Sequence, residues 1–518
     1  MGSNQGNRVR HLERALRSLA DHACPAQNAS SLYETAAQPK FVSDVAGVSS
    51  SALPSASKAG GTQPGADEDG DKMAPYLNAC CSLRTRLSPK DLLSALHEIE
   101  KDCGRVRQAS DADLTRSLQH SSYFAPARPV DLDILLYGDQ VIDQTELTVP
   151  HARMLLRDFV LLPLQELLRA DGREDMLHPI THARLCDLPM PDGGSGPFRY
   201  LPGLGSVGAG RSWLLGILNT TPDSFSDGGL YNEASRAVDR ASAMYRDQGC
   251  HMVDVGGEST RPGAEEVDVS EELARVGDVY AALKREKIPF SADTQKAVVA
   301  RQALRAGAAC INDISFGGYE ASGAMFQLLA EGIADLAAVR GAETESLSAL
   351  DESQEFFYIG MHRLDLKSRD FPAHCQRGTK RDSNGAEKCG VADSKSLIDY
   401  INHYFEDRLK ELWHAHGVPP WRVVCDPGLG FAKTQAQSFE LVRHAAQLHR
   451  PLQCFGHSRK KFVSCAQGTG TTWVGEATLP GNLAISCALA TKLSFRMMLR
   501  IHDVAETQRS LEALRVIG

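Results

Sequence analysis

Short apolar runs that end in polar, glycine-punctuated loops recur along the second half of the chain. The first run, 213–218, leads into the loop 219–229, and seven further runs end at Gly256, Asp293, Asn312, Met361, Asp426, Gly456 and Arg500. Helix-like segments such as 233–248 and 296–306 lie between most of them. Eight strands alternating with helices predict an α/β fold, the closed (β/α)8 TIM barrel, whose polar strand ends gather on one face.

The first half of the chain predicts a smaller α+β unit. Apolar residues at helical spacing favour a helix over 9–23, and Ser88 and Pro89 are typical of a helix start. Strands are expected over 76–87 and 130–137. The predicted division is a first domain over 1–180 with an insertion at 41–71, a Gly- and Pro-rich linker over 181–211, and a barrel domain over 212–518 with insertions at about 336–355 and 376–394.

Composition narrows the class of protein. A chain of 518 residues favours two domains, and a net charge of −9 argues against a general nucleic-acid or membrane binder. The 13 cysteines are scattered without a paired spacing, which favours reduced thiols. No apolar run has transmembrane length, and no signal-peptide pattern is present. We therefore expect a cytoplasmic enzyme, or an organellar one if a presequence has been removed.

Two carboxylates, Asp131 and Asp133, are the main candidate chemistry of the first half. Residues two apart on a strand face the same side, so their charges repel, and Mg²⁺ bridged to phosphate relieves that repulsion. The alternative is a solvent-facing pair on an edge strand. Cationic side chains suited to polyphosphate surround the pair in sequence and favour the metal: Arg105, Arg107, Arg128, His151, Arg153 and Arg157.

At this point the chain resembles the 6-hydroxymethyl-7,8-dihydropterin pyrophosphokinase family. The matching pieces are 2–4, 76–79, 104–107, 128–134 and 149–151 with Arg157 and Phe159. The resemblance implies a ferredoxin-like fold that transfers a pyrophosphoryl group from ATP to the pterin hydroxymethyl group and releases AMP. It further implies Mg²⁺ on Asp131 and Asp133, polyphosphate contacts from Arg105, Arg128, His151 and Arg157, and pterin contacts from Tyr76, Asn78 and Phe159.

Two departures from this family bear on the first activity. The family's opening strand should precede Gly2, where only Met1 stands, and the loop 108–127 is long and lacks the family's common tryptophan. A missing central strand would leave ladder groups unpaired. The alternative function is therefore an active second half attached to an impaired, structural pyrophosphokinase half.

The second half resembles dihydropteroate synthase across roughly 210–518. The motifs are 215–229, 254–263, 292–294, 311–313, 361–362, 426–431, 458–460 and 500–503. This family condenses the dihydropterin diphosphate with 4-aminobenzoate, giving 7,8-dihydropteroate and pyrophosphate. With the first half upstream, the chain looks like the bifunctional folate-biosynthesis enzymes of plants and protists. A related pterin-binding methyltransferase barrel is the competing interpretation.

The second resemblance also implies roles for single residues. The pterin edge would be bound by Asp293, Asn312, Asp426 and Lys460, and the diphosphate by Arg500, His502 and a Mg²⁺ held by Asn219. The aminobenzoate would be framed by Thr260, Arg261, Phe431 and Ser458. C–O cleavage would run ahead of amine attack, so that leaving-group stabilisation is the main catalytic work. A homodimer or higher oligomer through the barrel helices is implied by the resemblance as well.

Overall fold

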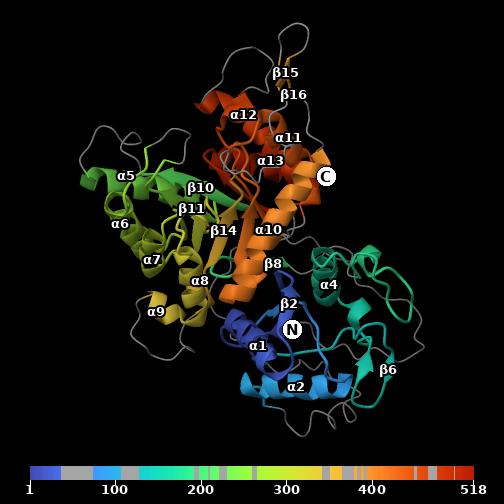
Figure 1. The fold of residues 1–518 in the computed structure, drawn as a ribbon. Helices are drawn as coiled ribbons and strands as arrows, with labels where there is room; N and C mark the ends of the chain where they lie inside the picture. Colours follow the sequence, from blue (N-terminus) through green and yellow to red (C-terminus); the bar gives the residue numbers. More distant parts are fainter. Residues whose placement is uncertain are drawn as a thin grey trace, which may run out of the picture.

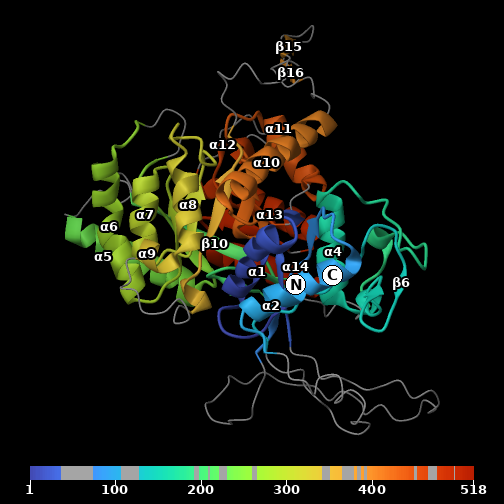
Figure 2. The ribbon, with the colours of Figure 1, turned by 60° about the horizontal axis from the view of Figure 1, so that its bottom comes forward.

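The computed structural model describes most of the chain as a barrel and a smaller sheet-and-helix part packed against it (Figures 1 and 2). The described residues are 1–36, 74–106, 128–191, 198–207, 211–220, 230–259, 265–340, 351–363, 379–381, 387–389, 394–448, 452–464, 475–494 and 496–517. The predicted insertion at 41–71 lies outside them.

Eight parallel strands close into the barrel, which confirms the predicted fold class. Their order around the barrel is their order along the chain, and each is short and buried because helices cover the outer face. They are β10 (Trp213–Asn219), β11 (Met252–Gly256), β12 (Phe290–Asp293), β13 (Cys310–Asp313), β14 (Phe357–Met361), β17 (Val423–Asp426), β18 (Gln453–Phe455) and β19 (Met497–Ile501).

Two of the described barrel helices, α6 and α11, begin at a side-chain cap. Asp268 accepts from the Glu271 N–H at the start of α6, and Thr434 and Gln437 form a reciprocal capping box on α11. The expected helix over 296–306 is α7, and the one over 233–248 is α5 followed by a five-residue π-helical turn. The helices are α5 (Leu230–Ser242), α6 (Val269–Arg285), α7 (Ala297–Arg305), α8 (Ala324–Ala334), α9 (Leu336–Arg340), α10 (Ser394–His416), α11 (Gln435–Arg443), α12 (Lys461–Ser464), α13 (Leu479–Leu493) and α14 (Val504–Ile517).

The smaller part is a mixed arrangement of short strands and three helices. Its main sheet has the order β1-β4-β3-β8-β9, and β5 pairs separately with β2. Two of these helices begin at a side-chain cap. Asn7 accepts from the Arg10 N–H at the start of α1, and Ser88 accepts from the Asp91 N–H at the start of α2. The elements are β1 (Gly2–Ser3), α1 (Arg8–His22), β2 (Ala26–Ala29), β3 (Leu32–Thr35), β4 (Tyr76–Asn78), β5 (Cys81–Leu83), α2 (Pro89–Asp102), β6 (Ile142–Asp143), β7 (Thr148–Val149), α4 (Asp158–Ala170), β8 (Phe198–Leu201) and β9 (Gly205–Ser206).

Two predicted strands of this part are wrong in extent. The strand expected over 76–87 is split into β4 and β5, because β4 pairs with β1 and β3 whereas β5 pairs with β2. The strand expected over 130–137 is reduced to one antiparallel bridge, between Asp131 and Gly2. Residues 132–137 pair with no neighbouring strand, although their apolar side chains favour the strand conformation.

The opening strand of the sheet is present as two residues. In β1, Gly2 and Ser3 pair with Asn78 and Leu77 of β4. On the other side, the Gly2 N–H donates to the Asp131 carbonyl at 2.9 Å, and the Gly2 carbonyl accepts from the Asp131 N–H at 2.8 Å. The ladder groups of Gly2 and Ser3 are therefore paired, and the expectation about a strand before Gly2 stays a prediction.

Part of the predicted linker over 181–211 is regular structure that joins the two halves. Strands β8 and β9 form a hairpin that extends the smaller sheet through β3, and its turn lies against the barrel. At Gly203 (φ +79°) a Cβ would lie 2.0 Å from the Glu355 carbonyl oxygen, so only glycine fits there. Leu201 packs with Trp213, Met252 and other residues of the barrel interior, and so closes the amino end of the barrel with side chains.

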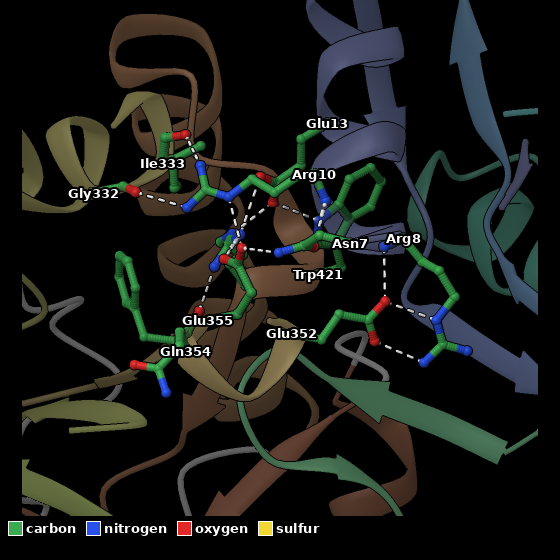
Figure 3. A network of polar contacts seen from close by, with 12 residues as sticks. Asn7, Arg8, Arg10, Glu13, Gly332, Ile333, Glu352, Gln354, Glu355 and Trp421 are labelled. Carbon is green, nitrogen blue, oxygen red and sulfur yellow. Dashed lines mark hydrogen bonds and ion pairs between the residues drawn. The ribbon is translucent and has the colours of Figure 1, made fainter. Parts of the chain in front are cut away.

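A buried ionic network holds α1 against the amino end of the barrel (Figure 3). Arg422, which precedes β17, donates to both carboxylate oxygens of Glu13 on α1 and, at 2.6 Å, to Glu355 before β14. The Glu355 carboxylate also accepts from Arg10 and Asn7 of α1. Since Arg422, Glu13 and Glu355 are each at most 1% exposed at the side chain, this is a permanent contact between the two halves.

Two predicted insertions in the barrel half are partly described. Residues 336–340 form α9, and Glu352 and Glu355 bind α1, so the described ends of the 336–355 segment belong to the domain contact. In the 376–394 segment, β15 (Thr379–Arg381) and β16 (Glu387–Cys389) pair antiparallel and project away from the barrel (Figure 2).

Candidate active sites

The carboxyl ends of the barrel strands bring the polar side chains predicted from the second half to one place. Cα partners run Asn219–Gly256–Asp293–Asn312 across four neighbouring strands, which sets three of these side chains in one layer. The register alone explains why residues nearly a hundred positions apart in sequence become neighbours.

The Arg500 guanidinium lies at the centre of this layer. Its Nε donates to Asp254 Oδ2 at 2.5 Å and its Nη2 to Asp293 Oδ2. Asn312 Nδ2 donates to the same Asp254 oxygen at 3.0 Å. Asp254 is fully buried, and its second oxygen, Oδ1, has no hydrogen-bond partner among the described residues.

Burial dominates the electrostatics of the two predicted pterin carboxylates. Burial raises the pKa of Asp293 to about 7; Arg500 opposes this shift, whereas the charge of Asp254 adds to it. Burial likewise raises the pKa of Asp426, against the opposing charge of Lys460. Asp293 is therefore held close to the point where it exchanges a proton, and both carboxylates can accept hydrogen bonds from a ligand.

Lys460 completes the layer from β18. A Cβ built on Gly456 would lie 3.7 Å from Lys460 Nζ, 3.8 Å from Arg500 Cδ and 3.8 Å from Asp426 Oδ2, so these groups meet over a residue without a side chain. Lys460 Nζ donates to the Leu429 carbonyl at 2.6 Å and lies 4.2 Å from the centre of the Phe431 ring. Burial lowers its pKa to about 8, with Asp426 acting in the opposite direction.

Ser458 and His502 form a second pair at this end. The Ser458 hydroxyl lies 3.1 Å from His502 Nδ1 and accepts from the His502 backbone N–H at 3.2 Å. Burial, reinforced by Arg459 and Arg500, lowers the pKa of His502 to about 3, so the imidazole is neutral at pH 7. Thr260 and Arg261 lie outside the described residues.

Two features of this end were missed at the sequence level. Asp254 was included only in a motif, although an acidic residue within the apolar run 252–255 was the available signal. Lys296, 2% exposed at the side chain, donates to Glu258 and, at 2.6 Å, to Glu272. No pattern around Lys296 predicted this bridge, because its partners come from two other elements.

His362, from the 361–362 motif, packs against aromatic side chains rather than facing the Arg500 layer. Its ring stands edge-on to Tyr404 with centroids 4.7 Å apart, and it is 1% exposed. Burial holds its pKa well below the ordinary value. Its carbonyl oxygen would lie 2.1 Å from a Cβ on Gly428 (φ +69°), which explains the glycine after Asp426.

The candidate residues of the smaller part gather around Asp131. Arg105 donates to Asp131 Oδ1 and Arg128 donates to Oδ2 at 2.9 Å. Arg105 also pairs with the buried Glu100, whose Oε1 accepts from the Leu132 N–H at 2.8 Å. Burial opposes ionisation of Asp131, but the two arginines outweigh it and lower the pKa.

The remaining candidates of this part lie around the same carboxylates. The charges of Asp133 and Asp131 act on the Arg157 guanidinium, and the charge of Asp133 acts on the His151 imidazole. Phe159 lies beneath the Arg157 guanidinium at 5.4 Å, and Tyr76 is coupled to Arg128 and Asp131. Asn78, 8% exposed, donates to the Thr35 hydroxyl at 3.1 Å on the neighbouring strand.

The described residues contain no group of three or more His, Cys, Asp or Glu side chains that could hold a metal ion. The two carboxylates at 131 and 133 match the donor set of a Mg²⁺ that takes its other ligands from phosphate and water. Within the described part, no helix is long and apolar enough to span a bilayer.

Comparison with known proteins divides the chain in the same way. Residues 215–502 match the family model for pterin-binding enzymes, and residues 48–169 match that of 7,8-dihydro-6-hydroxymethylpterin-pyrophosphokinase. The chain is 31% identical over 494 residues to the mitochondrial folate synthesis bifunctional protein of Pisum sativum, covering 89% of this chain and 79% of the relative. It is 29% identical over 542 residues to the folate synthesis bifunctional protein of Arabidopsis thaliana (98% and 92%) and 33% identical over 308 residues to the dihydropteroate synthase of Escherichia coli (59% and 90%).

The two matched regions correspond to the two clusters just described. The first contains Asp131 and its arginines, and the second contains the Arg500 layer. A methyltransferase barrel alone does not account for the first region. The chain therefore belongs to the family of bifunctional folate synthesis enzymes, which join a hydroxymethyldihydropterin pyrophosphokinase to a dihydropteroate synthase.

Proposed function

We propose that the carboxyl end of the barrel binds the diphosphate ester of 6-hydroxymethyl-7,8-dihydropterin beside 4-aminobenzoate, and that the Arg500 layer carries out the condensation. The observation that carries this proposal is a buried guanidinium between two carboxylates, one of which has a pKa of about 7. An arrangement of this kind offers both acceptors for a heterocycle edge and a cation for phosphate.

The pterin is assigned to the acceptors of the layer. Its ring N–H and amino groups donate to Asp293, Asp426 and Asn312, and Lys460 donates to its carbonyl or ring nitrogen. The raised pKa values of the two aspartates favour this assignment, because hydrogen bonds from a ligand replace the hydration that burial removes.

The diphosphate is assigned to Arg500 and His502. Arg500 retains donors beyond the two that contact carboxylates, and the neutral His502 imidazole can donate from one nitrogen. In the reaction, the bond between the methylene carbon and the diphosphate oxygen breaks with its electron pair on oxygen. The aniline nitrogen then bonds to that carbon and loses a proton. A Mg²⁺ held by Asn219 and the diphosphate would add positive charge on the leaving group.

The aminobenzoate is assigned to the rim of the layer. Phe431 offers an aromatic face beside Lys460, and Ser458 offers a hydroxyl. Thr260 and Arg261 are the proposed partners from the loop after β11. A neutral aniline needs no strong base before attack, which agrees with the neutral His502.

The smaller part is assigned to pyrophosphoryl transfer from ATP. Asp131 and Asp133 would hold Mg²⁺, whose charge neutralises the ATP phosphates when bound. Arg105, Arg128, His151 and Arg157 line the polyphosphate, and Tyr76, Asn78 and Phe159 contact the pterin. In this structure Arg105 and Arg128 neutralise Asp131, so binding the metal requires them to turn toward phosphate.

A coupled assay separates this proposal from its alternative, a structural first half. The enzyme is given ATP, hydroxymethyldihydropterin and aminobenzoate, and AMP and dihydropteroate are measured. Asp131→Ala should abolish AMP formation and leave conversion of supplied pterin diphosphate unchanged. Asp139→Ala, an exposed carboxylate in the same segment, is the control. Normal AMP formation by Asp131→Ala would reject the assignment of Mg²⁺ to Asp131. Absence of AMP formation by the wild-type enzyme would favour a structural first half.

We also infer a homo-oligomer and a reducing compartment. Val516 and Ile517 of α14 are 85% and 83% exposed, which supports an interface on the barrel helices, and light scattering would test it. Ten cysteines of the described part are free, which fits the cytosol or an organelle such as the mitochondrion named for the pea relative. Cell fractionation distinguishes the two.

A further inference from the structure

Lys433 is a buried lysine that has no part in the reaction as described so far. It follows the loop 427–432 after β17 and is 8% exposed. Its Nζ donates to three backbone carbonyl oxygens, those of Gly428 at 3.0 Å, His362 at 3.1 Å and Phe431 at 3.5 Å. Since His362 directly follows β14, the Lys433 side chain joins the loop after β17 to the end of a neighbouring strand.

The three carbonyl oxygens suit a charged side chain. An ammonium has three N–H donors, whereas a neutral amine has two. Burial lowers the pKa of Lys433 to about 7; Asp426 opposes this shift and Lys460 adds to it. Because its donors are used by backbone oxygens, Lys433 has none left for a substrate, and it acts on the loop instead.

The backbone of this loop departs from ordinary conformations. Gly428, Gly430 and Ala432 have φ values of +69°, +75° and +50°, all in the left-handed region. Glycine adopts that region freely, but a residue with a Cβ, such as Ala432, does so at a cost in free energy. Hydrogen bonds from Lys433 to the Gly428 and Phe431 carbonyls offset that cost and hold the loop in this shape.

The loop presents two groups to Lys460. The Leu429 carbonyl accepts from Lys460 Nζ at 2.6 Å, and the centre of the Phe431 ring lies 4.2 Å from the same atom. Asp426, by contrast, belongs to β17, and its carbonyl accepts from the His362 N–H at 2.8 Å. The strand ladder therefore holds Asp426, whereas Leu429 and Phe431 depend on the loop.

We propose that Lys433 is a positioning residue of the condensation, which fixes the loop 427–432 so that Phe431 faces 4-aminobenzoate beside Lys460. This inference rests on the proposed function, because it takes the Phe431 ring as part of the aminobenzoate site. Loss of the Lys433 ammonium should release Phe431 but leave the pterin acceptors in place, since those acceptors lie on paired strand residues. The expected signature is a selective loss of affinity for one of the two substrates.

The kinetic test compares Lys433→Met with the wild-type enzyme, both supplied with dihydropterin diphosphate and 4-aminobenzoate. KM for aminobenzoate should rise about tenfold or more, while kcat and KM for the pterin diphosphate stay within about threefold. Lys433→Gln keeps two N–H donors and should show the same split at about threefold; it also serves if the methionine variant does not fold. Lys410→Met, which removes an exposed lysine of α10, is the matched control and should change none of these values.

Hydrogen exchange measures the loop without any turnover. The N–H groups of Gly428, Gly430 and Phe431 all have hydrogen-bond acceptors in the structure. In Lys433→Met these three amides should exchange about tenfold faster, whereas the amides of β12 should exchange as in the wild type.

Three results would overturn the proposal. Equal changes in kcat and in both KM values would mean a general structural defect. An unchanged KM for aminobenzoate would mean that Lys433 does not position that site, and unchanged exchange over 428–431 would mean that the loop keeps its shape without Lys433. Failure of the proposed function would look different, because the wild-type enzyme itself would then make no dihydropteroate. The positioning role would fall with it, and faster exchange in Lys433→Met would record a structural role in the loop alone.

Discussion

The two ends of the barrel each bury an arginine between two carboxylates, and they use it differently. At the amino end, Arg422 joins Glu13 and Glu355, and a second arginine, Arg10, shares Glu355. At the carboxyl end, Arg500 alone joins Asp254 and Asp293. The amino-end cluster has as many arginines as carboxylates, whereas the carboxyl-end cluster has an excess of carboxylate.

The pKa values record this difference. Burial opposes ionisation of Glu355, but Arg422 and Arg10 outweigh it and lower its pKa to about 2. Burial raises the pKa of Asp293 to about 7 because one arginine does not outweigh it. The same three-residue motif is thus a structural clamp when cations match anions, and a prospective ligand site when they do not.

Breaking the amino-end clamp should have the largest effect on stability. Arg422→Met leaves Glu13 buried without its main partner, so the free energy of unfolding should fall by about 3–5 kcal/mol. Denaturant unfolding measures it. The matched control is Arg184→Met, which removes an exposed ion pair and is expected to leave the free energy of unfolding nearly unchanged. A loss below about 1 kcal/mol would show that the network does not hold the halves together.

Removing the carboxyl-end arginine should instead affect chemistry. Arg500→Ala should lower kcat/KM for condensation about 10²–10³-fold, since the leaving diphosphate loses its cation. The cost in stability should be smaller at pH 6 than at pH 8, because Asp293 can take up a proton. Steady-state assays with supplied pterin diphosphate test this. Arg246→Ala, which removes an exposed arginine of the barrel, is the control. Wild-type turnover by Arg500→Ala would refute the assignment of the diphosphate to Arg500.

The two carboxylates should give opposite pH dependences of stability. Glu355, lowered from its ordinary value of 4.5, contributes stability above pH 4.5 that is lost as pH falls toward 2. Asp293, raised from 3.8, contributes stability below pH 3.8 that is lost as pH rises toward 7. Thermal melts from pH 3 to 8 should show Glu355→Gln flattening the acidic limb and Asp293→Asn the limb near neutrality. Parallel profiles for both variants and the wild type would contradict the comparison.

The smallest effect is expected from Lys296, which supports the carboxyl end without belonging to the Arg500 layer. Its contact with Glu258, two residues before Thr260, fixes the start of the loop assigned to aminobenzoate. Lys296→Met should raise KM for aminobenzoate about tenfold with kcat within about threefold, and Lys296→Arg should restore most of it. Equal changes in kcat and in both KM values would indicate a general structural defect.

The contrast between the halves also shows what sequence could predict. Barrel strand ends were visible because each apolar run stops at a polar residue, and Asp293, Asn312 and Asp426 were located that way. The Arg500–Asp254 contact could not be predicted from the sequence, because it depends on the register of strands around a closed sheet. The clamp joins positions over 400 residues apart, Glu13 and Arg422, and no local pattern encodes it. The strand predicted over 130–137 was wrong beyond the single bridge at Asp131, because strand propensity cannot supply a pairing partner.

The β8–β9 hairpin, which brings Leu201 to the amino end of the barrel, affects how the pterin diphosphate can pass from the first active site to the second. Leu201, Trp213 and Met252 fill that end, so the barrel offers no axial passage, and the smaller part docks on the side away from the Arg500 layer. We therefore expect the pterin diphosphate to travel between the two sites outside the barrel axis. If it passes through bulk water, an added second-step enzyme from another source should compete for it on equal terms.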